Sequence, residues 1–248
     1  MTIPLLNITG TIFIIMLILC PLIYTSYRTI KKDRYELLKS NIYTILALGN
    51  AIAERDNNTD EHNYRVTYFS LCLGEAMNLN RHSLRTLVKG AFLHDVGKIG
   101  VCDNILLKTS RLSNEEYEDM KTHVQKGVCI VNDIPWLQDS KDVIRFHHER
   151  YDGSGYPLGI KGNQIPIVAR IFSIVDVFDA LISKRPYKDA MSYDDAIKVI
   201  RKQNQQFDPQ VFASFLKISK YLYYRALSMG KREYDICLTE KITQYFHV

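Results

Sequence analysis

Metal-ligating side chains recur inside apolar helical stretches of this chain, and this pattern constrains its fold more than any other feature. Five of the seven histidines and two aspartates form the series His62, His94, Asp95, His123, His147, His148 and Asp176. Imidazole and carboxylate together are ligands of divalent iron, manganese or zinc. Either group costs several kcal/mol in an apolar setting unless something pairs with it, and a metal ion does so. The series therefore predicts a buried metal site, and seven ligands exceed what one ion can use, so we expect two ions.

Length and composition limit the class of protein. The 248 residues allow one sizeable domain and an appendage. The 32 basic and 27 acidic residues give a formal charge of +5, too weak and too dispersed to indicate binding to a nucleic acid polymer. Five scattered cysteines without a CxxC spacing are typical of reduced thiols in a cytosolic compartment.

The N-terminal segment has the composition of a membrane anchor. No charged residue occurs from Ile3 to Tyr27, and about 20 apolar residues suffice to cross a bilayer. Basic residues follow from Arg28, so the positive-inside rule predicts a single-pass helix over residues 1–27 in the inner (cytoplasmic) membrane, with residues 3–24 in the bilayer and everything after Arg28 in the cytoplasm. A cleaved signal peptide is the alternative, but signal peptides carry basic residues before the apolar run, and none precedes it here.

Residues 28–39 form a basic juxtamembrane segment, and residues 35–55 carry apolar side chains at helical spacing. This spacing allows two interpretations. The segment is either a short coiled coil that makes a homodimer or, in its second half, the first helix of the catalytic domain.

The rest of the chain has the pattern of successive helices, and no convincing alternation of β-branched residues occurs. A glycine-rich loop is expected at 151–166, and helices after the caps Ser192 and Asp208. The other expected helices cover 61–79, 83–97 from the N-cap Ser83, Ser113 to about Val131 from a capping box, 140–149 and 167–183. The class is all-α.

Four of the candidate ligands differ in what their own surroundings indicate. Asp176 interrupts an apolar helix and needs a partner there, either a metal or a salt bridge with Arg170 or Arg185. The doublet His147-His148 follows an apolar run. His123 lies in a polar part of its helix, which by itself indicates exposure.

Seven motifs occur in order and carry a resemblance to a known family. They are His62-x-x-Arg65-Val66, His94-Asp95-x-Gly97-Lys98-Ile99, Lys121-x-His123, His147-His148-Glu149, Asp152-Gly153-Ser154-Gly155-Tyr156-Pro157, Asp176-x-x-Asp179-Ala180-Leu181 and Arg185-Pro186-Tyr187. Over about residues 40–217 the chain resembles the HD-GYP domain of bacterial signalling phosphodiesterases. The resemblance implies an HD-superfamily helical bundle preceded by the single transmembrane helix, with 218–248 as a C-terminal helical tail.

The resemblance also implies the chemistry. His62, His94, Asp95 and Asp176 would hold one ion, and Asp95 would bridge to a second ion held by His123, His147 and His148. Iron or manganese is favoured, and zinc is the alternative. Lys98 would bind the scissile phosphate, and Tyr156, Arg185 and Lys188 would contact the substrate. A metal-bridging hydroxide would then hydrolyse cyclic di-GMP to pGpG, and in some members onward to GMP. Some members bind a third metal through a Glu at the position of Asn58, a poor ligand, so two ions are expected here.

Three functions are compatible with the sequence. The first is a cyclic di-GMP phosphodiesterase, and the second is a phosphodiesterase for another cyclic dinucleotide such as cyclic GMP-AMP. The third is a non-catalytic binding or docking module, which the complete ligand set argues against. The GYP loop could also dock a diguanylate cyclase (GGDEF) partner, as the family suggests.

Overall fold

The computed structural model describes residues 3–56, 60–184 and 189–246. Every regular element within these ranges is a helix, which confirms the all-α class. The chain divides into two compact units, residues 1–44 and 45–248. The first unit is helical throughout its described part, and the second contains all the candidate metal ligands.

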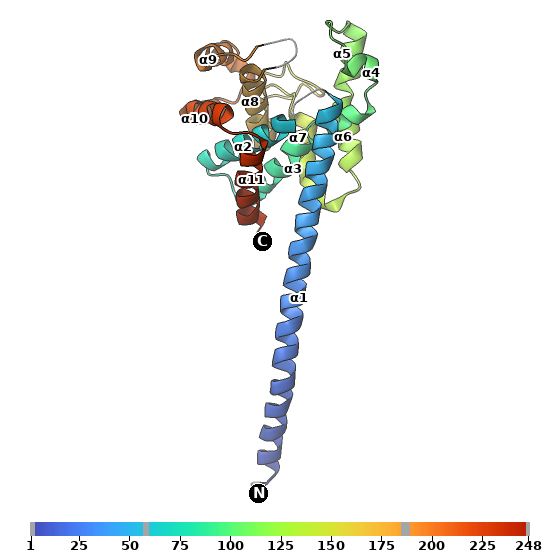
Figure 1. The fold of residues 1–248 in the computed structure, drawn as a ribbon, viewed down its shortest axis with the longest axis vertical. Helices are drawn as coiled ribbons and strands as arrows, with labels where there is room; N and C mark the ends of the chain where they lie inside the picture. The colour runs from blue at the N-terminus through green and yellow to red at the C-terminus, as the bar shows by residue number, and fades with distance from the viewer. Residues whose placement is uncertain (1–2, 57–59, 185–188, 247–248) are drawn as a thin grey trace. The chain divides into compact units, whose positions relative to one another are not determined.

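Helix α1 (Ile3–Arg55) contains Pro21 and runs without a break across its whole range (Figure 1). Its apolar side chains from Ile12 to Ile23 are exposed. The helix is long and apolar enough to cross a membrane. Apolar surface of this extent is costly in water, and a bilayer would cover it.

The last part of α1 belongs to the core of the second unit. Ile45 and Ile52 lie in one apolar cluster with Leu93, Val96 and Val128. This placement agrees with the interpretation that the second half of residues 35–55 is the first helix of the domain.

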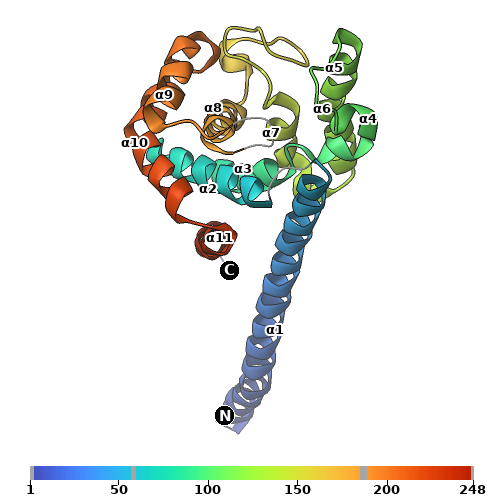
Figure 2. The same cartoon turned by 45° about the horizontal axis from the view of Figure 1, so that its top comes forward.

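Helix α8 (Ile167–Ile182) is the central element of the second unit. It contacts α2 (Asp60–Ala76), α3 (Arg81–Leu93), α7 (Lys141–Phe146), α9 (Tyr193–Lys202) and α10 (Pro209–Ser228), which surround it in Figure 2. Most of its side chains are fully buried, as its apolar sequence predicts. The last helix, α11 (Lys231–Phe246), packs on α2 and α3, so the segment 218–248 is part of the same compact unit.

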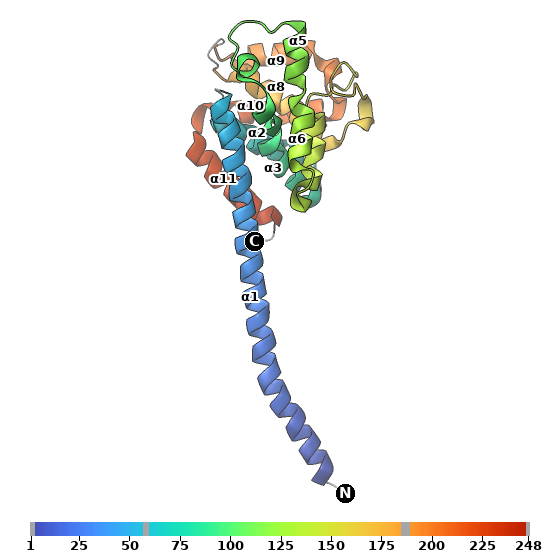
Figure 3. The same cartoon turned by 90° about the vertical axis from the view of Figure 1, so that its right-hand side faces the viewer.

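A second group of helices adjoins this core. The 3-10 turn η1 (Val96–Gly100) follows α3 and contacts α6 (His123–Val131). Helices α4 (Asp103–Leu106) and α5 (Asn114–Lys121) lead into α6, as Figure 3 shows, and the 3-10 turn η2 (Pro135–Ser140) leads into α7.

Several expected helix boundaries are wrong, including the C-terminal ends of the helices expected at 61–79 and 140–149, which stop at Ala76 and Phe146. The N-cap of α3 is Asn80, whose side chain accepts a hydrogen bond from the backbone N–H of Ser83 at 2.9 Å, and the helix ends at Leu93. The capping box of Ser113 and Glu116 is present, but the helix it begins stops at Lys121, and a new helix starts at His123. Short polar side chains cap from several positions, so the sequence places a cap only approximately.

Candidate metal centre

The structure brings the seven candidate ligands together in two clusters. In each cluster, one donor atom from every residue lies within 4.8 Å of the others. The clusters are His62, His94 and Asp176, and Asp95, His123, His147 and His148.

Asp95 lies between the two clusters. Its Oδ2 is 3.0 Å from Nε2 of His94, and its Oδ1 is 3.5 Å from Nε2 of His123. Neighbouring side chains on a helix diverge by about 100°. His94 and Asp95 can nevertheless face one centre because α3 ends at Leu93 and the chain turns there into η1. One carboxylate therefore offers one oxygen to each cluster.

Three histidines present the same ring nitrogen to the centre. Nδ1 lies 2.8 Å from the carbonyl oxygen of Ala91 in His94, and 2.7 Å from that of Met120 in His123. In His147, Nδ1 lies 2.9 Å from the carbonyl oxygen of Ile144. A carbonyl only accepts, so Nδ1 carries the proton and the lone pair is on Nε2. The donor atoms left free by these contacts are the ones that face one another, which fits a bound metal.

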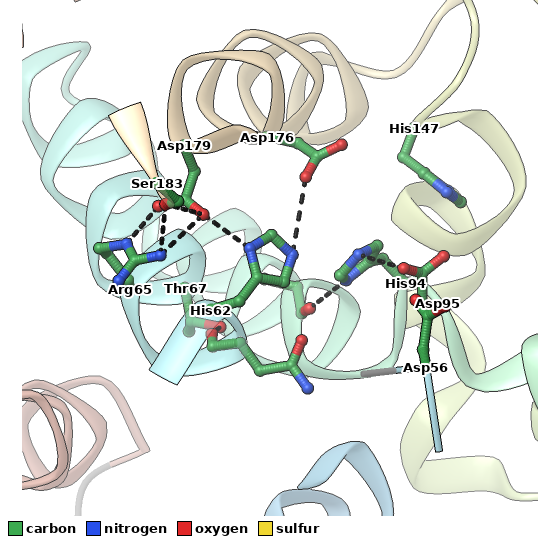
Figure 4. Close-up of polar contacts among 12 residues, drawn as sticks. Asp56, His62, Arg65, Thr67, His94, Asp95, His147, Asp176, Asp179 and Ser183 are labelled. Carbon is green, nitrogen blue, oxygen red and sulfur yellow. Dashed lines mark hydrogen bonds and ion pairs between the residues drawn. The ribbon is translucent and has the colours of Figure 1, made fainter. Parts of the chain in front are cut away.

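His62 is oriented by a carboxylate instead of a carbonyl. Its Nδ1 lies 2.7 Å from Oδ2 of Asp179, and its Nε2 is 3.7 Å from Asp176 (Figure 4). Asp179 is completely buried and also accepts hydrogen bonds from Arg65 and Ser183. Burial alone would raise the pKa of Asp179, but Arg65 and His62 outweigh it and hold this pKa below its ordinary value.

The electrostatics favour the metal-binding form of Asp95, His147 and His148 and oppose it for His94. Burial lowers the pKa of His147 and His148 far below the ordinary histidine value, and the neighbouring histidines lower it further. Both imidazoles are then neutral at pH 7, as ligation requires. Burial also opposes ionisation of Asp95, but His94 and Lys98 outweigh it and lower the pKa of this carboxyl. For His94, the charge of Asp95 outweighs burial and raises the pKa.

Lys98 lies beside Asp95 and is held by the end of α1. Its Nζ is 2.8 Å from Asp95 and 2.6 Å from Asp56, and these two carboxylates raise its pKa against the effect of burial. Arg55 donates to the carbonyl oxygens of Lys98 at 2.8 Å and Ile99 at 2.7 Å. The last residues of α1 thus fix both the backbone and the ammonium group of Lys98.

Gly97 allows η1 to lie against α6. A Cβ atom at this position would be 1.8 Å from the carbonyl oxygen of His123 and 2.4 Å from the nitrogen of Gly127. Real Cβ atoms do not approach backbone so closely. Glycine is therefore required where the turn that carries Asp95 meets the helix that carries His123.

The loop after His148 is fixed above the second cluster. Glu149 is buried, and its Oε1 accepts hydrogen bonds from the N–H groups of Leu158 at 2.7 Å and Gly159 at 3.2 Å. The N–H of Tyr156 donates to the carbonyl of His148 at 3.2 Å. The two rings of this pair stack, with centroids 4.6 Å apart. Tyr156 thus covers one face of a candidate ligand.

Residues 47–211 match the HD domain family. The chain belongs to this family. The chain is 38% identical to a cyclic di-GMP phosphodiesterase of Thermotoga maritima, over 72% of this chain and 50% of the relative. It is 37% identical to the cyclic di-GMP phosphodiesterase response regulator RpfG of Xanthomonas campestris, over 70% and 47%. A 3'3'-cGAMP-specific phosphodiesterase 2 of Vibrio cholerae is 35% identical, over 75% and 35%.

The chain spans about half the length, or less, of these relatives. Among solved structures, a cyclic GMP-AMP specific phosphodiesterase of Vibrio cholerae matches with a TM-score of 0.62 and 16% identity, over 79% of this chain and 53% of that one. An HDG"Y"P protein from Bdellovibrio bacteriovorus matches with a TM-score of 0.54 and 24% identity, over 66% and 54%. At these identities, the two structures show the fold alone. HD-domain phosphohydrolases depend on metals, in keeping with the two His/Asp clusters.

Some expected positions in the HD domain differ from the observed ones. His123 is 1% exposed, because α6 packs against η1 and α7 and encloses it. Arg170 donates to Asp208 and not to Asp176. His82 is exposed. Asn58, Arg185 and Lys188 lie outside the described residues.

The HD domain also uses polar residues to which the sequence gave no separate role. In the sequence, Asp179 and Arg65 stand out only as parts of the family motifs. Asp179 nevertheless interrupts the apolar helix α8 in the same way as Asp176 does. This interruption could have identified Asp179 as a functional residue from the sequence. Asp56 carried no such signal, because its role depends on the packing of the end of α1 against η1.

Proposed function

We propose that this chain is a metal-dependent phosphodiesterase that hydrolyses cyclic di-GMP to pGpG, and onward to GMP where the linear product can rebind. The observation that carries this proposal is the pair of ligand clusters joined by Asp95, with the ammonium group of Lys98 2.8 Å from that carboxylate. The names of the relatives support the substrate class.

Two divalent transition ions are proposed for the centre. One would be held by His62, His94, Asp95 and Asp176, and the other by Asp95, His123, His147 and His148. Nitrogen-rich sets with carboxylates suit iron or manganese, and zinc is the alternative. When bound, such a pair supplies a nucleophile from water at neutral pH and neutralises charge on a phosphate.

The chain's own residues would position the substrate. Lys98 stays protonated, since its pKa is raised, and it would bind the scissile phosphate as a point charge. As phosphate oxygens gain charge during in-line attack, that ammonium group would stabilise them. Tyr156 is proposed as a substrate contact beside His148, and Arg185 and Lys188 as further contacts.

The test uses the full-length protein, purified anaerobically in detergent. Bound metals are measured by mass spectrometry, and turnover of cyclic di-GMP is followed by chromatography. Asp95→Ala should remove most of the bound metal and abolish turnover. Asp195→Ala is the control, because Asp195 is exposed and its side chain contacts Ser192 and Lys198 at the surface. Full activity in Asp95→Ala would overturn the proposal.

A second candidate substrate is cyclic GMP-AMP. The relative named 3'3'-cGAMP-specific phosphodiesterase 2 is 35% identical to this chain, close to the values for the cyclic di-GMP enzymes. Turnover of both dinucleotides in the same assay separates the two candidates. A protein that binds either one but hydrolyses neither would be a non-catalytic binding or docking module.

We also propose a location and a division of the chain. The exposed apolar part of α1 would cross the inner membrane once, and the catalytic domain, residues 40–217, would lie in the cytoplasm, which the basic residues after the apolar part support. Residues 218–248 would be a C-terminal helical segment that packs on that domain through α11. Two interactions are also proposed: docking of a diguanylate cyclase on the loop 151–166, as the family resemblance suggests, and a homodimer through a coiled coil in residues 35–55, as the helical spacing of its apolar residues allows.

A further inference from the structure

Helix α5 presents an aromatic ring and a lysine beside the metal centre, and the function proposed above uses neither. Tyr117 is 47% exposed, and its ring lies 6.3 Å from the ring of Tyr156 in an edge-to-face arrangement. The ammonium group of Lys121 is 5.1 Å from the centroid of Tyr117 and 5.5 Å from that of Tyr156. These three side chains form one cluster, which we call the tyrosine–lysine cluster.

The tyrosine–lysine cluster adjoins the candidate ligands on two sides. Tyr156 stacks on His148, so Tyr117 is only two ring contacts from the second ligand cluster. Lys121 precedes His123 by two residues, at the point where α5 ends and α6 begins. Figure 2 shows the loop 151–166 reaching towards this end of the α5–α6 pair. A nucleotide whose phosphate is at the metal centre could therefore place its base here.

Tyr117 and Lys121 can each contact a ligand. Nearly half of Tyr117 is exposed, and an aromatic face of this kind stacks with a nucleobase. The ammonium group of Lys121 is 2.6 Å from Glu118, but Glu118 is 69% exposed. The side chain of Lys121 is 23% exposed and the pair is open to solvent on the side of Glu118, so the pair contributes little, and Lys121 can donate to a ligand from its place beside the two rings. A lysine donates well to O6 and N7 of guanine, whereas adenine presents an amino group in place of O6.

We propose that Tyr117 and Lys121 form a guanine-binding subsite, in which the base stacks on Tyr117 and Lys121 donates to O6 and N7. The inference rests on the proposed function, since a cyclic dinucleotide must place its phosphate at the metal centre. It adds the base that is selected and the residues that select it.

The test measures binding of GMP and AMP, which present the same base edges without a scissile diester, to metal-loaded full-length protein by calorimetry. The wild type should bind GMP more tightly than AMP. Tyr117→Leu should weaken GMP binding about 5- to 100-fold, and Tyr117→Phe should restore it because the ring is kept. Lys121→Met should reduce the preference for GMP over AMP by about tenfold.

Matched controls are Tyr224→Leu and Lys198→Met, an exposed tyrosine on α10 and an exposed lysine on α9. Both should bind GMP as the wild type does, and thermal melting checks that every variant is folded. Unchanged GMP affinity in Tyr117→Leu would overturn the stacking role. Equal losses for GMP and AMP in Lys121→Met would make Lys121 a phosphate contact and overturn the guanine assignment.

Failure of the subsite and failure of the proposed function give different results. A wild type that binds GMP through Tyr117 and Lys121 but turns over no cyclic dinucleotide would contradict the phosphodiesterase proposal alone. A wild type that hydrolyses cyclic di-GMP, with both variants unchanged in GMP binding and in KM, would contradict the subsite alone.

Discussion

Nδ1 of His62 lies 2.7 Å from Oδ2 of Asp179, and both side chains are buried. The carboxylate holds the imidazole with Nε2 towards Asp176, while Arg65 neutralises the charge of Asp179 from the other side. This relationship fixes one ligand of the first cluster through a residue that is not itself a candidate ligand.

Asp179→Asn should therefore weaken metal binding at the first cluster about 10- to 100-fold. In a two-step metal titration followed by calorimetry, the step assigned to His62, His94 and Asp176 should weaken and the other should persist. The second step serves as an internal control, because an unfolded protein would lose both. Two unchanged steps would contradict the orienting role of Asp179.

Lys98→Ala should lower kcat for cyclic di-GMP roughly 100- to 1000-fold, because a charge that stabilises the transition state is removed. The metal content should stay near that of the wild type, since Lys98 is not a candidate ligand. Lys198→Ala, an exposed lysine paired with Asp195, is the control and should keep full activity. If Lys98→Ala loses bound metal to the same extent as it loses activity, then Lys98 acts by holding Asp95 and does not bind the substrate.

The metal-free protein should become less stable as the pH falls. The folded protein holds the pKa of His147 and His148 well below the ordinary value, mainly by burial. Below about pH 6.5 the unfolded chain binds protons at these positions and the folded chain does not, so the free energy of unfolding decreases. His94, with its raised pKa, acts in the opposite direction.

Urea unfolding of the chelated protein at about pH 7.5 and about pH 5.5 measures this effect. The double variant His147→Gln, His148→Gln should lose less stability over the same interval than the wild type. An equal loss in both proteins would assign the pH dependence to other groups.

Gly97→Ala should destabilise the protein by about 1–3 kcal/mol, because its Cβ would meet backbone atoms that cannot move aside. Gly100→Ala, in the same turn, is the matched control. Its Cβ would meet only the side chain of Lys126, at 2.8 Å, which is flexible. Thermal melting compares the two, and equal melting temperatures would contradict the close contact at Gly97.

The chain should sediment with membranes and resist extraction by carbonate, because we propose that the apolar part of α1, which is long enough, crosses the bilayer. A chain of residues 29–248 is the control and should be released. Release of the full-length protein by carbonate would exclude a membrane span.

The sequence predicted the helical class and the set of candidate ligands because both are properties of residue type and position. Apolar stretches at helical spacing are visible in one dimension, and so is an aspartate such as Asp176 that interrupts one. The spatial grouping of the histidines needed the fold, and the burial of His123 shows why. Its helix is polar locally, and only the packing of η1 and α7 encloses it.

Contacts between segments could not be predicted from the sequence either, because they depend on tertiary packing. Asp56 follows the end of α1 with no unusual pattern around it, and its distance of 2.6 Å to Lys98 arises from tertiary packing. No proline or glycine lies at Thr122 from which the break between α5 and α6 could have been predicted. Tyr117 likewise stands out only once the loop that carries Tyr156 is seen beside it.

The position of Asp95 makes the two halves of the centre interdependent. One negative charge is shared between them, so whatever cation arrives first draws on an anion that the next one also needs. If two ions bind as proposed, the first should weaken binding of the second, and cells short of metal would hold half-filled protein over a wide range of metal supply.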